Sequence, residues 1–134
     1  MAFYGKLYTL EKNENFESFV NSLNLPQEKT QAYINSKPSQ KIEKDGDGFV
    51  LTTIAANWTN EMKFKHGLEF DEKVTSDIVT KNTITVDGNK VTQVQKAPDG
   101  KTITYVREFS PEQLVVTITA DFWDGVAKRI YVAK

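Results

Sequence analysis

Turn-forming residues interrupt most of this chain at short intervals, and that spacing constrains the fold more than any other feature. The runs between the turns are rich in β-branched residues, which favour strands. Short strands joined by hairpin turns predict an antiparallel sandwich or barrel, because parallel strands need a long crossover connection. The turn signals are Asp45-Gly46-Asp47-Gly48, His66-Gly67, Asp87-Gly88-Asn89, Pro98-Asp99-Gly100, Ser110-Pro111 and Asp124-Gly125. The clearest strand candidates are residues 49–54, 83–86, 102–106 and 114–119.

One segment near the start predicts helix instead. Its apolar residues follow the i, i+3, i+4, i+7 spacing of a single helical face. They are Phe16, Phe19, Val20 and Leu23. Glu14 and Glu17 would lie in the first turns, where a carboxylate suits the helix dipole. Pro26 suits the start of a second helix that ends near 36–38, so we expect a helix-turn-helix over about residues 14–36.

Composition excludes several kinds of site. The 134 residues fit one domain, 1–134, and the net charge of −1 argues against a nucleic-acid partner. With no cysteine and one histidine, we expect no thiol chemistry, no metal and no cofactor. Asp45-Gly46-Asp47-Gly48 begins like an EF-hand loop, but the twelfth position is Ala56 instead of Glu, which favours a hairpin turn. No nucleophile, base and orienting group share a usable spacing, so we expect no enzyme.

Arg107 lies on an unexpected face of its strand. Strand side chains alternate between faces, so Arg107 shares its side with Ile103, Tyr105 and Phe109. A guanidinium buried there needs a carboxylate, a hydrogen-bond network or a bound anion. Two alternatives need no ligand: the side chain extends out of the core, or it pairs with a buried acid.

The last strand is ambiguous by pattern. Hydrophobicity alone would turn Val126, Ile130 and Val132 inward and leave Arg129 in water. A barrel with a water-filled cavity would do the reverse, with Arg129 and Tyr131 inside. Periodicity leaves both arrangements open.

A set of motifs runs through the chain from end to end. It comprises Gly5, Glu14-Asn15-Phe16, Lys37-Pro38, Gly46-Asp47, Gly67-Leu68-Glu69-Phe70-Asp71-Glu72, 83–88, Asp99-Gly100-Lys101, Arg107, Leu114-Val115-Val116 and Arg129-Ile130-Tyr131. The Arg-x-Tyr ending, in register with Arg107 and the Glu-Phe-Asp-Glu block, makes the combination specific. With this combination of motifs the chain resembles the intracellular fatty-acid-binding protein family, and residues 123–127 resemble the insect members.

The resemblance implies a ten-stranded antiparallel up-and-down β-barrel, or β-clam, closed by the helix-turn-helix. It implies that Arg107, Arg129 and Tyr131 bind a carboxylate inside the barrel. It also implies a second group of residues in the cavity or lid, namely Phe16, Phe19, Val20, Tyr105, Val116 and Ile118. The family's portal phenylalanine aligns with Asn57, beside Trp58, and its first-strand tryptophan with Leu7.

We therefore expect a non-enzymatic carrier of long-chain fatty acids, one per barrel, that is monomeric and cytoplasmic. Transient contact with a membrane is compatible with this function. Retinoic acid, which also carries a carboxylate, is the alternative ligand. A secreted lipocalin-type carrier, a barrel enzyme and a β-domain with a filled core are the rival classes. The chain shows no apolar leader, cysteines or early glycine-x-tryptophan of the lipocalin kind.

Overall fold

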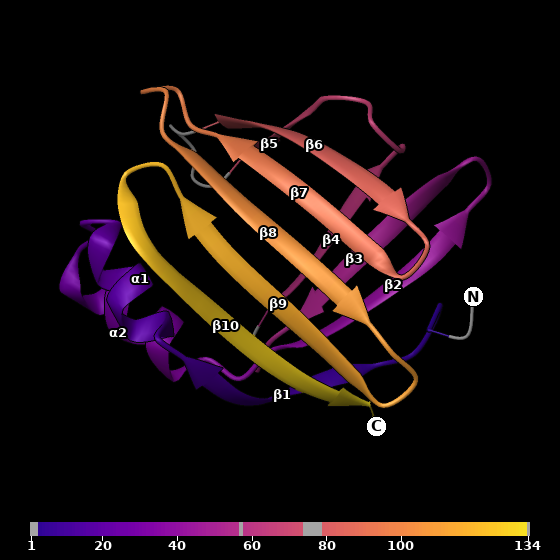
Figure 1. Cartoon of the computed structure of the whole chain (residues 1–134), viewed down its shortest axis with the longest axis horizontal. Helices are drawn as coiled ribbons and strands as arrows, with labels where there is room; N and C mark the ends of the chain where they lie inside the picture. The colour runs from indigo at the N-terminus through magenta and orange to yellow at the C-terminus, as the bar shows by residue number, and fades with distance from the viewer. Residues whose placement is uncertain (1–2, 57, 74–78, 134) are drawn as a thin grey trace.

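The computed structural model describes residues 3–56, 58–73 and 79–133 and contains ten strands and two helices (Figure 1). The helices are α1 (Phe16–Ser22) and α2 (Gln27–Asn35). The strands are β1 (Tyr8–Glu14), β2 (Ser39–Asp45), β3 (Gly48–Ile54), β4 (Thr59–Phe64), β5 (Phe70–Lys73), β6 (Val79–Asp87), β7 (Lys90–Lys96), β8 (Thr102–Phe109), β9 (Gln113–Ala120) and β10 (Trp123–Ala133). Within these residues no helix is long and apolar enough to cross a membrane.

The strands form a single antiparallel sheet in the order β4-β3-β2-β1-β10-β9-β8-β7-β6-β5. Almost every strand pairs with its neighbour in sequence, and β1 pairs with β10 to join the first and last strands. The sheet curls so that its two edge strands, β4 and β5, come toward each other, and among the described residues they do not pair (Figure 1). The predicted up-and-down β-clam is confirmed.

Two local predictions are wrong. Asp124-Gly125 is not the turn before the last strand. The chain turns at Asp121-Phe122, and Asp124 and Gly125 lie inside β10. They fall where the β9–β10 register shifts between Trp123 and Ala127, a bulge that accommodates the glycine. Glu14 ends β1, where it pairs with Lys128, instead of opening the helix.

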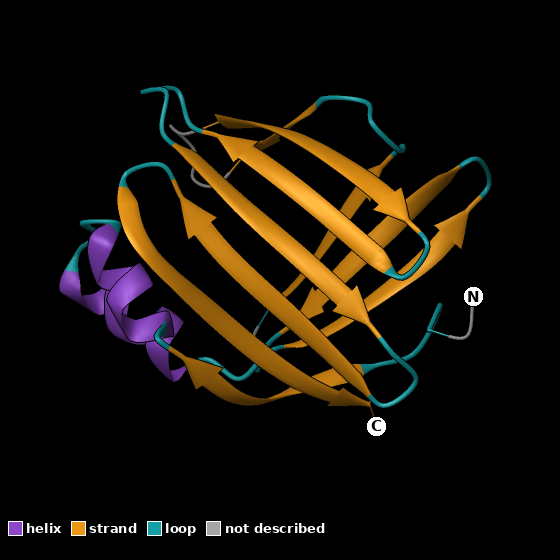
Figure 2. Cartoon of the chain, viewed as in Figure 1, coloured by secondary structure: helices purple, strands orange, loops and turns teal. Residues whose placement is uncertain are grey.

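The two helices lie next to each other at one end of the barrel (Figure 2). The apolar face of α1 is buried as its spacing predicts, with Phe16, Phe19 and Val20 almost fully covered. Phe19 packs 5.5 Å from the Trp123 ring, and Asn15 donates a hydrogen bond to the Val126 carbonyl. The lid, residues 15–36, is therefore attached chiefly to β10.

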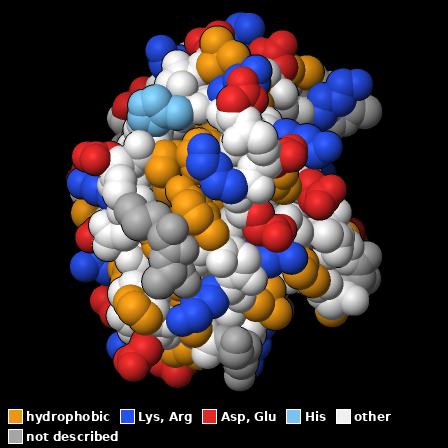
Figure 3. Space-filling model, turned by 90° about the vertical axis from the view of Figure 1, so that its right-hand side faces the viewer, with side chains coloured by type: hydrophobic (Ala, Val, Ile, Leu, Met, Phe, Trp, Pro, Cys, Tyr) orange, Lys and Arg blue, Asp and Glu red, His pale blue; other side chains and the backbone are white. Residues whose placement is uncertain are grey.

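Aromatic side chains fill the barrel away from the helices. Phe3 stacks on Phe109 with ring centroids 4.8 Å apart, and Tyr8 packs edge-on against the same ring. Tyr8 is fully buried and donates its hydroxyl hydrogen to the Ser110 carbonyl. Leu7 is only partly buried, so Tyr8 is the large buried aromatic at the start of β1. On the outside of this end, hydrophobic side chains gather near the middle among charged ones (Figure 3).

Gly48 starts β3 where the backbone of β4 comes close. A Cβ at this position would lie 2.8 Å from the Phe64 carbonyl oxygen. We expect Gly48→Ala to lower the free energy of unfolding by about 1–3 kcal/mol, because one strand must shift to admit the methyl group. Urea denaturation measures this. Gly46→Asn is the control, since Gly46 has open space and a φ of +60° that asparagine tolerates. Equal losses in the two variants would contradict the prediction.

Candidate functional site

A cavity of about 640 Å³ lies between the lid and the barrel wall. Its lining differs from side to side. The lid and strands β8–β10 contribute mainly apolar groups, among them Phe16, Phe19, Val20, Ile103, Tyr105, Val116 and Ile118. Polar groups come from β2 and from β4–β8 and β10, among them Gln40, Asn60, Glu72, Thr80, Gln95, Arg107, Arg129 and Tyr131. An interior of this kind suits a long apolar molecule that has a polar end.

Arg107 is held inside the barrel by two neutral amides. It projects from β8, exposes only 7% of its surface, and faces the cavity as its strand pattern predicts. Its Nε donates to Gln40 Oε1 at 3.3 Å, and its Nη1 donates to Gln93 Oε1 at 3.0 Å. A guanidinium has five N–H donors, so these two bonds leave three for a ligand. A hydrogen-bond network was one of the three ways, beside a carboxylate and a bound anion, in which the sequence allowed a buried Arg107 to be compensated.

Gln40 also determines how the Tyr131 hydroxyl can act. Because its oxygen accepts from Arg107, its Nε2 must point the other way, and it donates to the Tyr131 hydroxyl at 3.1 Å. The hydroxyl oxygen is thereby an acceptor toward Gln40 and keeps its own hydrogen for another acceptor. Gln40 was not among the residues expected from the sequence. The available signal was its position two residues before the fully buried Ile42, on the same face of β2.

Arg129 lies at the junction of the barrel wall and the lid. It projects inward from β10 beside Tyr131, which settles the ambiguous face of the last strand. Its Nε donates to Asn13 at 2.9 Å, and its Nη2 donates to the carbonyl of Ser36 at 3.3 Å. The guanidinium carbon also lies 4.0 Å from the centre of the Phe16 ring, a cation–π contact. Arg129 thus lines the cavity and contacts both ends of the lid.

Neither cavity arginine forms an ion pair in the described part of the chain, although Glu72 lines the same cavity and interacts electrostatically with Arg107. The six ion pairs in this part of the chain all involve lysines, and none includes Arg107 or Arg129. Burial lowers the pKa of Arg107 and of Arg129, while charge interactions with Tyr105 and Tyr131 partly oppose the shift. Burial raises the pKa of Tyr131, so its hydroxyl keeps its hydrogen. The arrangement offers a concentrated positive charge and several N–H and O–H donors, which suit a carboxylate.

No family model matches the chain, but individual proteins do. Fatty acid-binding protein 2 of Manduca sexta is 42% identical over 133 residues, which cover 99% of this chain and 100% of that protein. The chain belongs to the fatty-acid-binding protein family. The solved structure of a fatty-acid-binding protein isolated from Manduca sexta aligns with a TM-score of 0.89 at 42% identity, over 98% of this chain and 99% of that one.

A more distant member of the family was solved with a ligand. The Schistosoma mansoni fatty acid binding protein, in complex with arachidonic acid, aligns with a TM-score of 0.88 at 27% identity, over 99% of this chain and 96% of that chain. The Manduca sexta relatives confirm the family and the insect member that the sequence motifs indicated.

All nine site residues expected from the family resemblance line the cavity. They are Arg107, Arg129, Tyr131, Phe16, Phe19, Val20, Tyr105, Val116 and Ile118. Their contact with a ligand stays a prediction. Asn57, which aligns with the family's portal phenylalanine, lies outside the described residues, whereas Trp58 lines the cavity and is 49% exposed. Trp58 therefore lies at the mouth.

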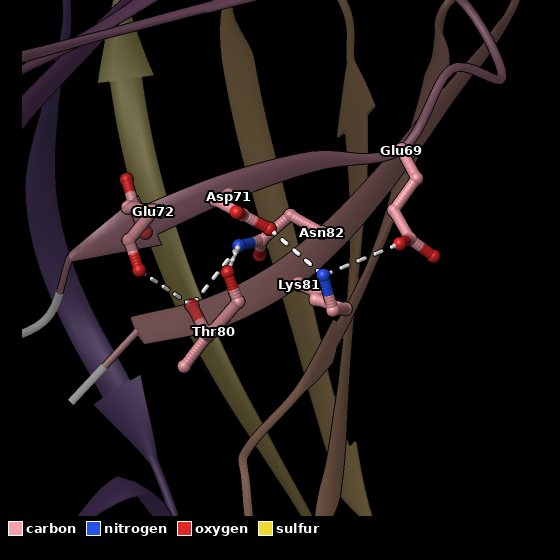
Figure 4. A network of polar contacts seen from close by, with 6 residues as sticks. All are labelled: Glu69, Asp71, Glu72, Thr80, Lys81 and Asn82. Carbon is pink, nitrogen blue, oxygen red and sulfur yellow. Dashed lines mark hydrogen bonds and ion pairs between the residues drawn. The ribbon is translucent and has the colours of Figure 1, made fainter.

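A chain of amides connects Arg107 to the far wall of the cavity. Gln93 accepts from Arg107 and donates to Asn82 at 2.8 Å, and Asn82 donates to the Thr80 hydroxyl at 3.0 Å. Thr80 in turn donates to the backbone carbonyl of Glu72 at 3.2 Å (Figure 4). Every buried side-chain polar atom in the described residues has a partner. The network orients each amide and so supports the position of Arg107.

Tyr105 makes the stability of the folded protein depend on pH in the alkaline range. Burial raises its pKa from 10.0 to about 12, although Arg107 favours the ionised form. The folded protein therefore holds this proton more tightly than the unfolded chain does. The resulting stability is complete below pH 10 and is lost as the pH rises toward 12. We expect the free energy of unfolding of Tyr105→Phe to fall less steeply than wild type between pH 10 and 12. Equal slopes in urea titrations would contradict this.

Proposed function

We propose that this protein binds one long-chain fatty acid inside the barrel and carries it without changing it chemically. One observation supports this above the others: two arginines line a cavity that also has a large apolar part, and neither of them forms an ion pair among the described residues. A buried positive charge is costly unless an anion compensates it. The carboxylate of a fatty acid supplies that anion, and its chain fills the apolar remainder.

In the proposed complex, the head group lies among Arg107, Arg129 and Tyr131. Each arginine offers N–H donors that its protein partners do not use. Gln40 leaves the Tyr131 hydroxyl hydrogen free to point at a carboxylate oxygen. Gln40 and Gln93 act as positioning residues, because they hold the guanidinium of Arg107 without neutralising it.

The apolar chain supplies most of the affinity in this proposal. Burying about 15 methylenes at roughly 0.8 kcal/mol each gives a gross gain of about 12 kcal/mol. Ordering the chain and losing its overall freedom subtract several kcal/mol. A charge-assisted hydrogen bond adds only about 1.5–3 kcal/mol. The arginines therefore mainly determine orientation and the preference for an acid.

The proposed carrier is a cytoplasmic monomer that contacts membranes transiently when it takes up or delivers its ligand. Exposed aromatic groups at the mouth, Tyr33 on α2 and Trp58 between β3 and β4, support that contact. Aromatic rings with one polar end favour the interface between water and lipid. Neither side chain contributes to the core cluster.

Ligand extraction and titration test the proposal together. Protein purified without detergent should release long-chain fatty acid into organic solvent, and the delipidated protein should bind oleate at one molecule per monomer in isothermal titration. A stoichiometry of zero, or a steady release of hydrolysed or oxidised lipid by the pure protein, would overturn it. Tighter binding of retinoic acid than of oleate would assign the alternative ligand instead.

A further inference from the structure

A partly buried carboxylate lines the same cavity as the two arginines. Glu72 projects into the cavity from β5, whereas its neighbour Asp71 is exposed and pairs with Lys81 at 3.2 Å (Figure 4). The charge of Glu72 interacts with that of Arg107, yet none of the six ion pairs among the described residues includes Glu72. A negative charge therefore acts on the anion site without occupying it.

Neutral amides hold the two charged groups in separate positions. Asn60 forms a side-chain hydrogen bond with Glu72. Gln40 and Gln93 accept hydrogen bonds from the guanidinium of Arg107. Because uncharged partners bind both groups, the open N–H donors of Arg107 stay available to a ligand. The charge of Glu72 reduces their attraction for an anion, since Coulomb interactions act without direct contact.

The influence of Glu72 extends over the head-group end of the cavity. Burial raises the pKa of Glu72, while the hydrogen bond with Asn60 and the positive charge of Arg107 favour its ionised form. The same carboxylate acts on Tyr105, whose ring centre lies 5.5 Å from the guanidinium carbon of Arg107. A ligand head group that binds Arg107 therefore also meets the charge of Glu72.

The other charged residues of the lining differ from Glu72 in exposure. Lys73, Asp99 and Lys101 also line the cavity, but all three are exposed. Lys101 pairs with Asp99 at 3.9 Å. Water and salt screen exposed charges more strongly than charges that are partly buried. Of the two carboxylates that line the cavity, Glu72 therefore acts more strongly on a head group at the arginines.

We propose that Glu72 is a specificity-determining residue, which weakens the binding of head groups in proportion to their negative charge. This inference rests on the proposed function, since the head group must lie at the arginines. A carboxylate carries one negative charge, whereas a phosphate monoester carries nearly two above its second pKa of about 6. The repulsion from Glu72 is about twice as large for the phosphate. Glu72 thereby favours fatty acids over alkyl phosphates of the same length.

Three ligands of equal chain length and different charge test this role. Hexadecanol, palmitate and hexadecyl phosphate compete against a fluorescent fatty acid at pH 8, in wild type and in Glu72→Gln. Glutamine keeps an oxygen that accepts from Asn60 but has no charge. Comparing one ligand between the two proteins cancels its own hydration and chain burial. We expect Glu72→Gln to bind hexadecanol as wild type does, palmitate about fivefold more tightly and hexadecyl phosphate about 25-fold more tightly, because a Coulomb energy is proportional to the ligand charge.

Asp99→Asn is the matched control, because it removes one negative charge from an exposed part of the lining. It should change each of the three affinities by less than about twofold. Equal changes for all three ligands in Glu72→Gln, or no change, overturn the inference. If Glu72→Gln fails to fold, Glu72→Ser removes the charge in the same comparison, and equal changes there overturn it. Failure of wild type to bind palmitate would instead refute the proposed function.

Discussion

Arg129→Ala should weaken oleate binding by roughly 10- to 1,000-fold without abolishing it. Truncating one partner of a buried charged contact costs about 3–5 kcal/mol where it is fully desolvated, and each 1.4 kcal/mol is tenfold. Arg129 is only partly buried, so its loss should cost less than that upper limit. The apolar chain keeps its cavity contacts, which is why binding persists. Displacement of a fluorescent fatty acid measures the change.

Lys128→Ala is the matched control, because Lys128 is the exposed neighbour on the outer face of β10. It should leave affinity within about twofold of wild type. Arg129→Gln tests head-group choice: a neutral amide should narrow the preference for the acid over the matching alcohol. An unchanged acid-to-alcohol ratio, with the fold intact by circular dichroism, would show that another group holds the carboxylate.

Replacing the lid, residues 15–36, by a short glycine-serine linker should accelerate fatty acid release by at least about tenfold. The lid covers the cavity with Phe16, Phe19 and Val20, which are almost fully buried. Burial of each such side chain contributes about 1.5–3 kcal/mol. If only one of these contacts must break before the ligand leaves, it slows fatty acid release by about tenfold. The deletion keeps Glu14, which belongs to β1.

Stopped-flow transfer of a fluorescent fatty acid to acceptor vesicles measures release. Circular dichroism first establishes that the shortened chain keeps its strand signal. Phe19→Ala is a milder version that removes the contact with Trp123, and it should lie between wild type and the deletion. Wild-type release rates in a folded, lidless barrel would contradict the proposed role of the lid.

The fold was largely predictable because its elements are local. Turn residues such as Pro98-Asp99-Gly100 mark a hairpin, and the spacing from Phe16 to Leu23 marks the buried face of α1. The β9–β10 turn was missed since Asp121-Phe122 contains neither glycine nor proline, while the more typical Asp124-Gly125 lies in a bulge. The residue types alone do not distinguish a glycine in a hairpin turn from a glycine in a β-bulge.

The site was predictable in part. Arg107 stood out in the sequence because a charged residue on an apolar strand face is rare. The direction of Arg129 became clear only in the structure, because the cavity allows polar side chains on the inner face of β10. Gln40, Asn82 and Gln93 gave a weaker signal, since an uncharged amide on an inward face needs only hydrogen-bond partners and no compensating charge. Their importance arises from partners up to 91 residues away, as between Gln40 and Tyr131. Such pairings exist only once the barrel closes.

The pairing of β1 with β10 has a consequence for the order of events during synthesis. Contacts such as that between Tyr8 and Ala133 join nearly the whole chain, so barrel closure is slow compared with forming the hairpins in between. Arg129 and Tyr131 lie on that same last strand. A nascent chain whose β10 is still in the ribosome exit tunnel therefore has neither a closed barrel nor its complete set of donors. The ability to take up cargo should appear only after β10 has left the tunnel.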